Sequence, residues 1–204
     1  IVDLREFDCV TFLENTLALA FLERYDAAAV PLFLDNLKKI RYRNGKIEGY
    51  TSRLHYSSDW LYEMQRQGFL EDVTRECGGI HFPIDVFFMT KNACRYPAFE
   101  KDSLLIFQME QIETAIGKRK YFYIPKKDIG KIQEKIQEGD IVLLTTDIKG
   151  LDTSHVGIAV KKGEKTYLLH ASSTAGKVVL SALPLSEYME KIPSQTGIML
   201  GRVR

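Results

Sequence analysis

Cysteine is scarce in this sequence and forms no recognisable pattern. The 204 residues contain only Cys9, Cys77 and Cys94, and no two of them make a CxxC pair. This scarcity excludes a small disulfide-framework protein. Cys77 and Cys94 could still pair with each other, which would leave one free thiol. We expect that free thiol to be Cys9.

An excess of charge and a long apolar run are also missing. Lys and Arg total 28 against 27 for Asp and Glu, so the formal net charge is +1. Such a balance creates no global field for nucleic acid or an anionic membrane. No run approaches the ~18–20 apolar residues that a membrane span requires. We therefore expect no nucleic-acid partner and no membrane span in this chain, while protein partners stay unknown.

A signal peptide is not visible either. The chain begins with isoleucine rather than methionine, so we expect the natural start to have been removed. The hydrophobic fraction of 45% is ordinary for a globular protein and supplies enough apolar side chains for a sizeable core. The length suits one domain.

Helical periodicity dominates the first half of the sequence. Val10, Leu13 and Leu17 follow the three-and-four spacing of an amphipathic helix, and Asp8 is a plausible N-cap. Helix start and stop signals predict three more helices, over about 31–43, from 59 onward, and over about 102–116.

Strand-forming runs dominate the second half. They are YFYI from Tyr121, DIVLLTT from Asp140, HVGIAV from His155, TYLLHAS from Thr166, KVVLSAL from Lys177 and GIMLGRV from Gly197, with a short helix from Leu185. Helices followed by strands indicate an α+β fold with a mostly antiparallel sheet. The sequence shows no internal repeat or flexible linker, so we expect a single domain over residues 1–204.

Two of the four histidines lie on neighbouring predicted strands. His155 and His170 are 170 − 155 = 15 residues apart, which suits one hairpin that turns at KKGEK. Such a hairpin can place both side chains on one face. Cys9 lies at a helix start, where backbone N–H groups and the macrodipole favour a thiolate. If that helix docks on the hairpin, the site holds a nucleophile, a base and an orienting group.

Plainer interpretations of the same residues stay open. Cys9 could be a small buried hydrophobe, and each histidine could be a hydrogen-bonded structural residue. A zinc site is another use of cysteine and histidine, although their spacing here is poor for metal ligands. The carboxylate of Asp8 also opposes thiolate formation, unless it is occupied in capping the helix.

Four motifs in a fixed order resemble one superfamily. They are DCVTF from Asp8, QEGDIVLL from Gln137, SHVGIAV from Ser154 and LLHASS from Leu168. They look like the successive signatures of the NlpC-type, papain-like cell-wall cysteine peptidases. The resemblance implies Cys9 as nucleophile, His155 as general base and His170 as the orienting group. It also implies an N-terminal catalytic helix, a mostly antiparallel sheet or partial barrel, and no metal or organic cofactor.

A second stretch resembles one branch of that superfamily. RYRNGKIEGYTSRLHYSSDW, from Arg41, is similar to the hallmark of the N-acetylmuramoyl-L-alanine amidase-like proteins of bacterial envelopes. These enzymes cut the amide between the muramic acid lactyl group and L-Ala of the stem peptide. They are associated with small turnover fragments of peptidoglycan, including 1,6-anhydromuramoyl peptides.

The branch resemblance carries further expectations for this chain. We expect a cysteine amidase that degrades peptidoglycan fragments during cell-wall recycling, located in the periplasm or cell envelope. Residues from about 26 to 120 would be a family-specific, mostly helical insertion. The sequence begins eight residues before Cys9, so a segment that walls the active site in relatives is expected to be missing.

The segment SRLHYSSDW, from Ser52 to Trp60, is the expected sugar-recognition wall. An arginine fork, polar ring edges and flat aromatic faces together suit a small-ligand pocket. The alternative is a structural loop in which an aspartate caps a helix and the tryptophan packs on the core. The residues assigned to substrate binding are Arg53, His55, Tyr56, Asp59, Trp60 and Ser154.

Two other functions remain alternatives to the amidase. One is a γ-D-glutamyl-diaminopimelate endopeptidase, the commoner activity of the superfamily. The other is an inactive module that only binds muropeptides. Suitable residues at all three triad positions argue against the inactive module.

Overall fold

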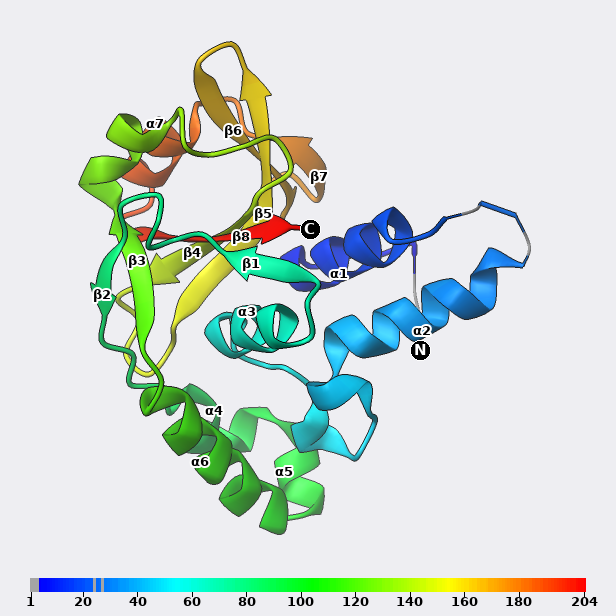
Figure 1. Cartoon of the computed structure of the whole chain (residues 1–204). Helices are drawn as coiled ribbons and strands as arrows, with labels where there is room; N and C mark the ends of the chain where they lie inside the picture. The colour runs from blue at the N-terminus through cyan, green and yellow to red at the C-terminus, as the bar shows by residue number, and fades with distance from the viewer. Residues whose placement is uncertain (1–3, 24, 27) are drawn as a thin grey trace.

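An eight-stranded sheet lies at the centre of the molecule (Figure 1), and the computed structural model describes residues 4–23, 25–26 and 28–204. The strand order is β2-β3-β8-β4-β5-β6-β7, and β1 pairs with β8. Every pairing is antiparallel, and the sheet is not closed. The strands are β1 (Leu70–Asp72), β2 (Ile80–Phe82), β3 (Tyr121–Pro125), β4 (Ile141–Thr146), β5 (Thr153–Lys162), β6 (Lys165–Ser172), β7 (Lys177–Leu180) and β8 (Gln195–Val203).

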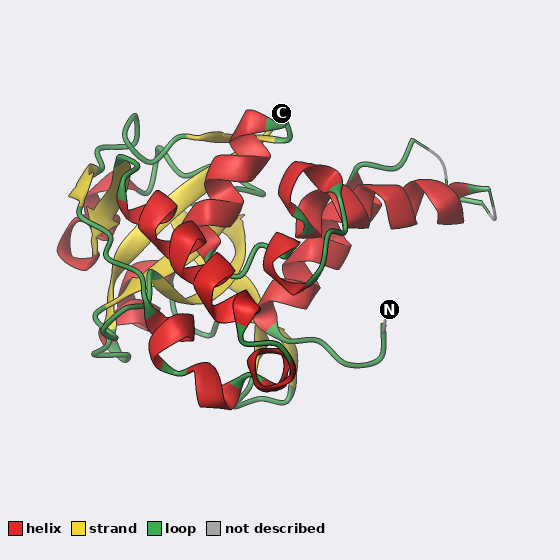
Figure 2. Ribbon diagram, turned by 90° about the horizontal axis from the view of Figure 1, so that it is seen from below, coloured by secondary structure: helices red, strands yellow, loops and turns green. Residues whose placement is uncertain are grey.

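Most of the helices precede the long strands along the chain and lie together, as the view from below shows (Figure 2). The helices are α1 (Cys9–Ala20), α2 (Ala29–Arg41), α3 (Ser57–Arg66), α4 (Phe88–Lys91), α5 (Pro97–Lys101), α6 (Leu104–Gly117) and α7 (Leu185–Glu190). Short 3-10 helices cover Arg43–Gly45, Tyr50–Ser52, Ala93–Arg95 and Lys126–Ile132. This architecture confirms the α+β prediction. In the described part of the chain, no helix is long and apolar enough to cross a membrane.

The predicted cap of α1 is present. The Asp8 carboxylate accepts the Thr11 backbone N–H at 2.6 Å, and the Thr11 hydroxyl oxygen accepts the Asp8 backbone N–H at 2.9 Å. This reciprocal pair is a capping box, and it satisfies two donors that a helix start leaves free. The two bonds also hold the backbone of Asp8, the residue directly before Cys9, against the first turn of the helix.

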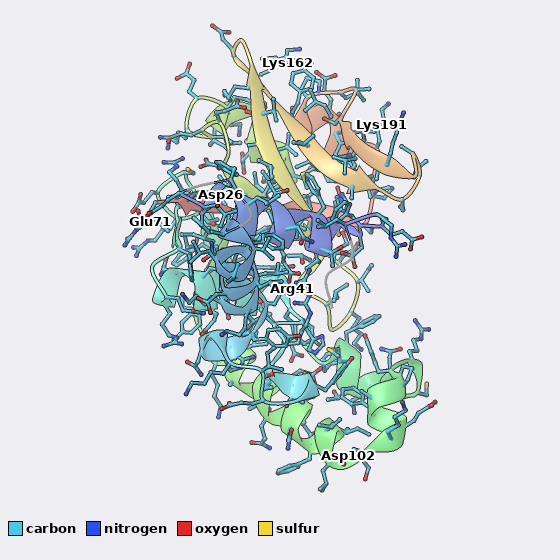
Figure 3. All side chains as sticks on the ribbon, turned by 90° about the vertical axis from the view of Figure 1, so that its right-hand side faces the viewer. Asp26, Arg41, Glu71, Asp102, Lys162 and Lys191 are labelled. Atoms are coloured by element: carbon cyan, nitrogen blue, oxygen red, sulfur yellow. The ribbon has the colours of Figure 1, made fainter. Side chains whose placement is uncertain are left out.

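The apolar run of β4 is buried on both faces of the sheet. Ile141 and Leu143 join the core beneath α1, α2 and α3, whereas Val142 and Leu144 join a second core beneath α7. Alternate side chains of a strand point to opposite faces, so a continuous apolar run is expected where both faces are covered. The β5–β6 hairpin (Lys162 labelled) and the α4–α6 region (Asp102 labelled) lie at opposite ends of the molecule (Figure 3).

The start of α3 differs from the prediction. The helix begins at Ser57 rather than at Asp59, and no side chain of its own segment caps it. Instead, the carboxylate of Asp152 accepts the Ser58 backbone N–H at 2.6 Å. This partner is 94 residues away in the sequence, so no local signal could have predicted the start. The three-residue strands β1 and β2 were also missed, because runs this short show no periodicity.

Candidate active site

Cys9 is the first residue of α1 and is half-buried. Burial raises the pKa of its thiol above the ordinary value, and the neighbouring Asp8 carboxylate adds to the rise. Backbone N–H groups of Val156, Cys9 and Val10 act in the opposite direction. The helix start therefore favours the thiolate as predicted, but burial outweighs it. The resting thiol is protonated at neutral pH, and a base must take its proton.

His155 and His170 are in direct contact. The His155 Nε2 atom lies 2.7 Å from the His170 Nδ1 atom, and the two rings are nearly perpendicular at 88°. His155 lies on β5 and His170 on β6, so the predicted hairpin and shared face are confirmed. Tyr188 of α7 packs against the His170 ring with centroids 5.5 Å apart, a contact that no sequence pattern indicated.

The protonation of this pair decides what His155 can do. Burial, with a contribution from His170, lowers the pKa of His155 to about 4, and burial also lowers the pKa of His170. Both rings are therefore neutral at pH 7, and one donates to the other. If His155 donates through Nε2, its Nδ1 keeps a lone pair and can accept a proton. Of the two directions, this one makes His155 a base.

One cavity of about 710 Å³ contains both Cys9 and His155 in its lining. The predicted residue Ser154 lines it as well, together with residues 5–8 and the end of the β6–β7 hairpin. Its volume suits a small ligand. The hairpin contributes Ser172, Ser173 and Lys177, which are not among the predicted site residues. The sequence did indicate their position, because the LLHASS motif leads directly into the turn that ends at Lys177.

The predicted sugar-recognition wall lies elsewhere. Residues 52–60 are all described, and none lines the cavity of Cys9. The Tyr56 and Trp60 side chains are only 2% and 4% exposed. The Tyr56 hydroxyl donates to Glu113 at 2.6 Å, and the Trp60 indole N–H donates to the Ile40 carbonyl at 3.1 Å. Their faces are in the core, which matches the structural alternative rather than a sugar platform.

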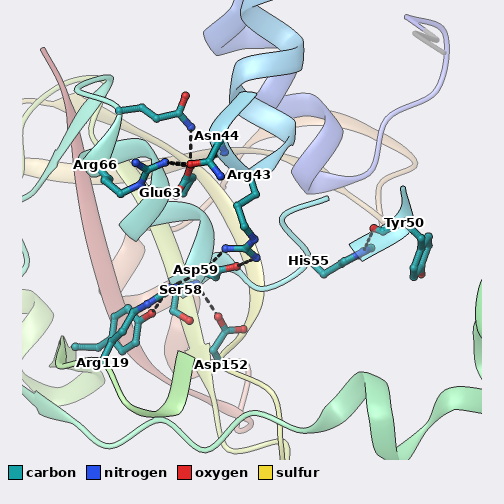
Figure 4. Close-up of polar contacts among 12 residues, drawn as sticks. Arg43, Asn44, Tyr50, His55, Ser58, Asp59, Glu63, Arg66, Arg119 and Asp152 are labelled. Atoms are coloured by element: carbon teal, nitrogen blue, oxygen red, sulfur yellow. Dashed lines mark hydrogen bonds and ion pairs between the residues drawn. The ribbon is translucent and has the colours of Figure 1, made fainter. Parts of the chain in front are cut away.

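The three polar residues of the same segment have partners within the protein. Arg53 pairs with Glu14 at 2.8 Å, and a ring nitrogen of His55 lies 3.2 Å from the Tyr50 carbonyl oxygen. Asp59 does not cap α3, because it pairs with Arg43 and Arg119, each at 2.6 Å. Figure 4 shows Asp59 with its two arginine partners, and His55 beside Tyr50, around the start of α3.

A zinc site was one interpretation of the cysteines and histidines. Across residues 4–23, 25–26 and 28–204, no group of three or more His, Cys, Asp or Glu side chains is placed to hold a metal ion. Cys9, Cys77 and Cys94 are all described, and all three are free thiols. Cys77 is buried and Cys94 is exposed, and they do not pair.

Solved structures similar to this chain come mainly from Bacteroides. An N-acetylmuramoyl-L-alanine amidase from Bacteroides uniformis is 36% identical, with a TM-score of 0.94 over 100% of this chain and 87% of that chain. A putative xylanase from Bacteroides fragilis is 39% identical, with a TM-score of 0.93 over 100% and 89%. A Legionella pneumophila protein at 23% identity and a TM-score of 0.68, over 97% and 75%, shares the fold.

Family membership follows from a match over nearly the whole chain. No curated protein matches the sequence. The family of AmiA-like proteins, described as N-acetylmuramoyl-L-alanine amidase-like, matches residues 1–198. The chain therefore belongs to the N-acetylmuramoyl-L-alanine amidase-like family.

Proposed function

We propose that this chain is a papain-like cysteine amidase of peptidoglycan fragments. It would cleave the amide between N-acetylmuramic, or 1,6-anhydro-N-acetylmuramic, acid and L-Ala of the stem peptide. One observation carries the proposal. Cys9, at the start of a helix, shares a cavity with His155, whose Nε2 lies 2.7 Å from His170 Nδ1. Family membership supports the substrate class.

The proposed mechanism begins with a neutral thiol and a neutral imidazole. His155 Nδ1 takes the proton of Cys9 as the sulfur attacks the lactyl carbonyl carbon, while Nε2 stays hydrogen-bonded to His170. Backbone N–H groups at the start of α1 stabilise the oxyanion. The imidazolium then protonates the L-Ala nitrogen, and the C–N bond breaks. Water, activated by His155, hydrolyses the thioester, releases the sugar acid and restores the thiol.

The cavity wall has the chemistry of a peptide site. Lys177 and Arg5 supply positive charge, and Ser154 and Ser172 supply hydroxyl groups. A stem peptide carries carboxylates and amides beside the bond to be cut, which such groups bind well. We also propose that residues 1–204 act as one catalytic domain in the periplasm or cell envelope, where peptidoglycan fragments are found.

Glycoside cleavage, suggested by the name of the Bacteroides fragilis relative, fits the cavity less well. A glycosidase generally needs two carboxyl groups flanking the bond, one as acid and one as base or nucleophile. Among the described residues that line the cavity, Glu6 and Asp8 are the acidic ones. Asp8 is occupied in the α1 cap. One available carboxyl group does not make this pair, so we favour the amidase.

The decisive experiment uses a defined 1,6-anhydro-disaccharide tetrapeptide with mass spectrometry of the products. The amidase releases an intact tetrapeptide that begins with L-Ala, and Cys9→Ala abolishes its release. Cleavage between D-Glu and diaminopimelate would identify the endopeptidase instead. Binding without cleavage would identify the inactive module, and cleavage by purified Cys9→Ala would overturn the cysteine mechanism.

A further inference from the structure

We infer that residues 53–58 form a positioning brace that holds the nucleophile helix and the base-bearing strand in register. This inference rests on the proposed function, because it concerns how Cys9 and His155 are aligned. The brace is the loop and first residues of α3 that sequence patterns had assigned to sugar recognition. It contacts α1 at one end and the start of β5 at the other.

The first contact fixes α1. Glu14 is five residues after Cys9 on the same helix, and its side chain is only 1% exposed. Arg53 donates to both carboxylate oxygens of Glu14, from Nη1 to Oε1 at 2.8 Å and from Nη2 to Oε2 at 3.1 Å. Arg41 adds a third bond at 2.6 Å. A bidentate pair constrains direction as well as distance, so it restrains the helix against rotation and sliding.

The second contact fixes the start of β5. Asp152 is fully buried and accepts the Ser58 N–H at 2.6 Å, and the Thr153 hydroxyl donates to the Ser57 hydroxyl at 2.6 Å. Thr153 is two residues before His155. The brace thus holds the strand directly before the base.

A β-bulge lies between this contact and the base. Leu144 of β4 pairs with His155 while the next residue, Thr145, pairs with Thr153, so Ser154 is the extra residue. Bulges bend a strand and redirect side chains, and they occur often beside active sites. The direction of the His155 side chain therefore depends on the position of the bulge. The brace fixes that position through Thr153, the residue directly before the bulge.

The middle of the brace packs behind the catalytic pair. Leu54 through Ser57 share a cavity of only about 20 Å³ with Val10 and Val156. Val10 follows Cys9 and Val156 follows His155. This volume admits about one water molecule, far too little for a sugar or an amino acid. The segment therefore acts through contact with both catalytic elements, as a positioning group, and not by touching substrate.

The structure supplies a matched pair of variants for the test. The Arg53 and Arg43 side chains are each 25% exposed, and each pairs with a carboxylate that is 1% exposed. Each carboxylate also has a second arginine partner, Arg41 for Glu14 and Arg119 for Asp59. Only the Arg53 pair reaches a catalytic element, so Arg43→Met is the control for Arg53→Met.

The experiment measures kcat and KM on the anhydro-muropeptide, and the rate of Cys9 alkylation by iodoacetamide from pH 5 to 9. A displacement of about 1 Å can cost on the order of 100-fold in rate. We expect Arg53→Met to lower kcat by about 10- to 100-fold, with KM within about 2-fold, and to shift the alkylation pH profile. Arg43→Met should lose similar thermal stability but keep both the kcat and the profile.

A second pair of variants tests the other end of the brace. Thr153→Val removes the hydroxyl and keeps the shape, and we expect it to lower kcat and shift the alkylation profile in the same way. Thr153→Ser restores the donor to Ser57 and should recover most of the wild-type kcat. Recovery of kcat in Thr153→Ser would show that the hydrogen bond to Ser57, rather than general packing of the side chain, positions the strand.

Several results would overturn the brace. A raised KM with unchanged kcat and alkylation in Arg53→Met would show that Arg53 contacts substrate. Equal effects of Arg53→Met and Arg43→Met would show a general loss of stability. Alkylation requires no muropeptide, so a wild-type protein that fails to cleave the fragment would contradict the proposed function alone. The alkylation profiles of the four variants would still decide on the brace.

Discussion

At the residue scale, burial and an uncharged partner together set the pH range in which His155 is neutral. His170 is buried, and it faces His155 with a ring nitrogen rather than a carboxylate. His170 brings no negative charge to offset the burial of His155, so burial keeps the pKa of His155 low, at about 4. His155 is then free to accept a proton at any pH well above 4.

This low pKa leads to a prediction for the pH dependence of catalysis. We expect the acid limb of kcat/KM to fall near pH 4, below the ordinary histidine range. His170→Asp places a carboxylate beside the imidazole, which favours the charged form and moves that limb upward by one or more pH units. The measurement is kcat/KM from pH 3.5 to 8 for both proteins. An unmoved limb in His170→Asp would show that this ring pair does not control the base.

The contact between His155 and His170, and the cavity that Cys9 shares with His155, could be predicted from the sequence, because each residue lies in a local motif and the motifs keep their order. Tyr56 and Trp60 could not be placed in this way. Their burial depends on Glu113, 57 residues after Tyr56, and on Ile40, 20 residues before Trp60. An aromatic residue beside an arginine has the same local pattern in a sugar site and in a core.

At the scale of elements, the pairing of β3 with β8 depends on one glycine. A Cβ atom at Gly197 would overlap the Ile124 carbonyl oxygen and lie 2.7 Å from Tyr123 Cδ2. The obstacle is backbone, which cannot move aside without parting the strands. Gly197 also pairs with Thr145 of β4, next to the bulge that carries Ser154.

We predict that Gly197→Ala lowers the free energy of unfolding by about 1–3 kcal/mol, the usual range for overpacking. Gly130→Ala is the control, because a Cβ there meets nothing within 4 Å. Urea denaturation of both variants checks the prediction. Equal stability of the two proteins would mean that the sheet adjusts without cost.

The long strands and α1 were predictable because each has its own periodic pattern or cap. Elements whose limits depend on distant partners were not. The start of α3 is set by Asp152, and β1 is set by pairing with β8, which is more than 120 residues later in the chain. The sequence also could not show that the sheet stays open, because strand order is a property of the whole chain.

At the scale of the whole molecule, two half-buried histidines link stability to pH. Burial lowers the pKa of both His55 and His155 to about 4 in the folded protein. In the unfolded chain each histidine binds a proton near pH 6.5. Between these values the unfolded state holds more protons, so stability is greatest above pH 6.5 and falls as the pH falls toward 4.

We therefore predict a decrease in Tm between pH 6.5 and pH 4.5. His155→Gln cannot take up the proton and should show a shallower decrease than the wild type. His81 lies on the exposed strand β2, and His81→Gln serves as the control. Identical slopes in all three proteins would mean that other groups carry the dependence.

The position of β8 affects the order in which the sheet can assemble during synthesis. Of the strands described here, it is the last to be synthesised, yet it lies between β3 and β4 in the middle of the sheet and also holds β1. Cys9 leaves the ribosome long before this strand exists. The sheet stays interrupted between β3 and β4 until β8 inserts, so a nascent or prematurely stopped chain cannot join the two parts of the sheet.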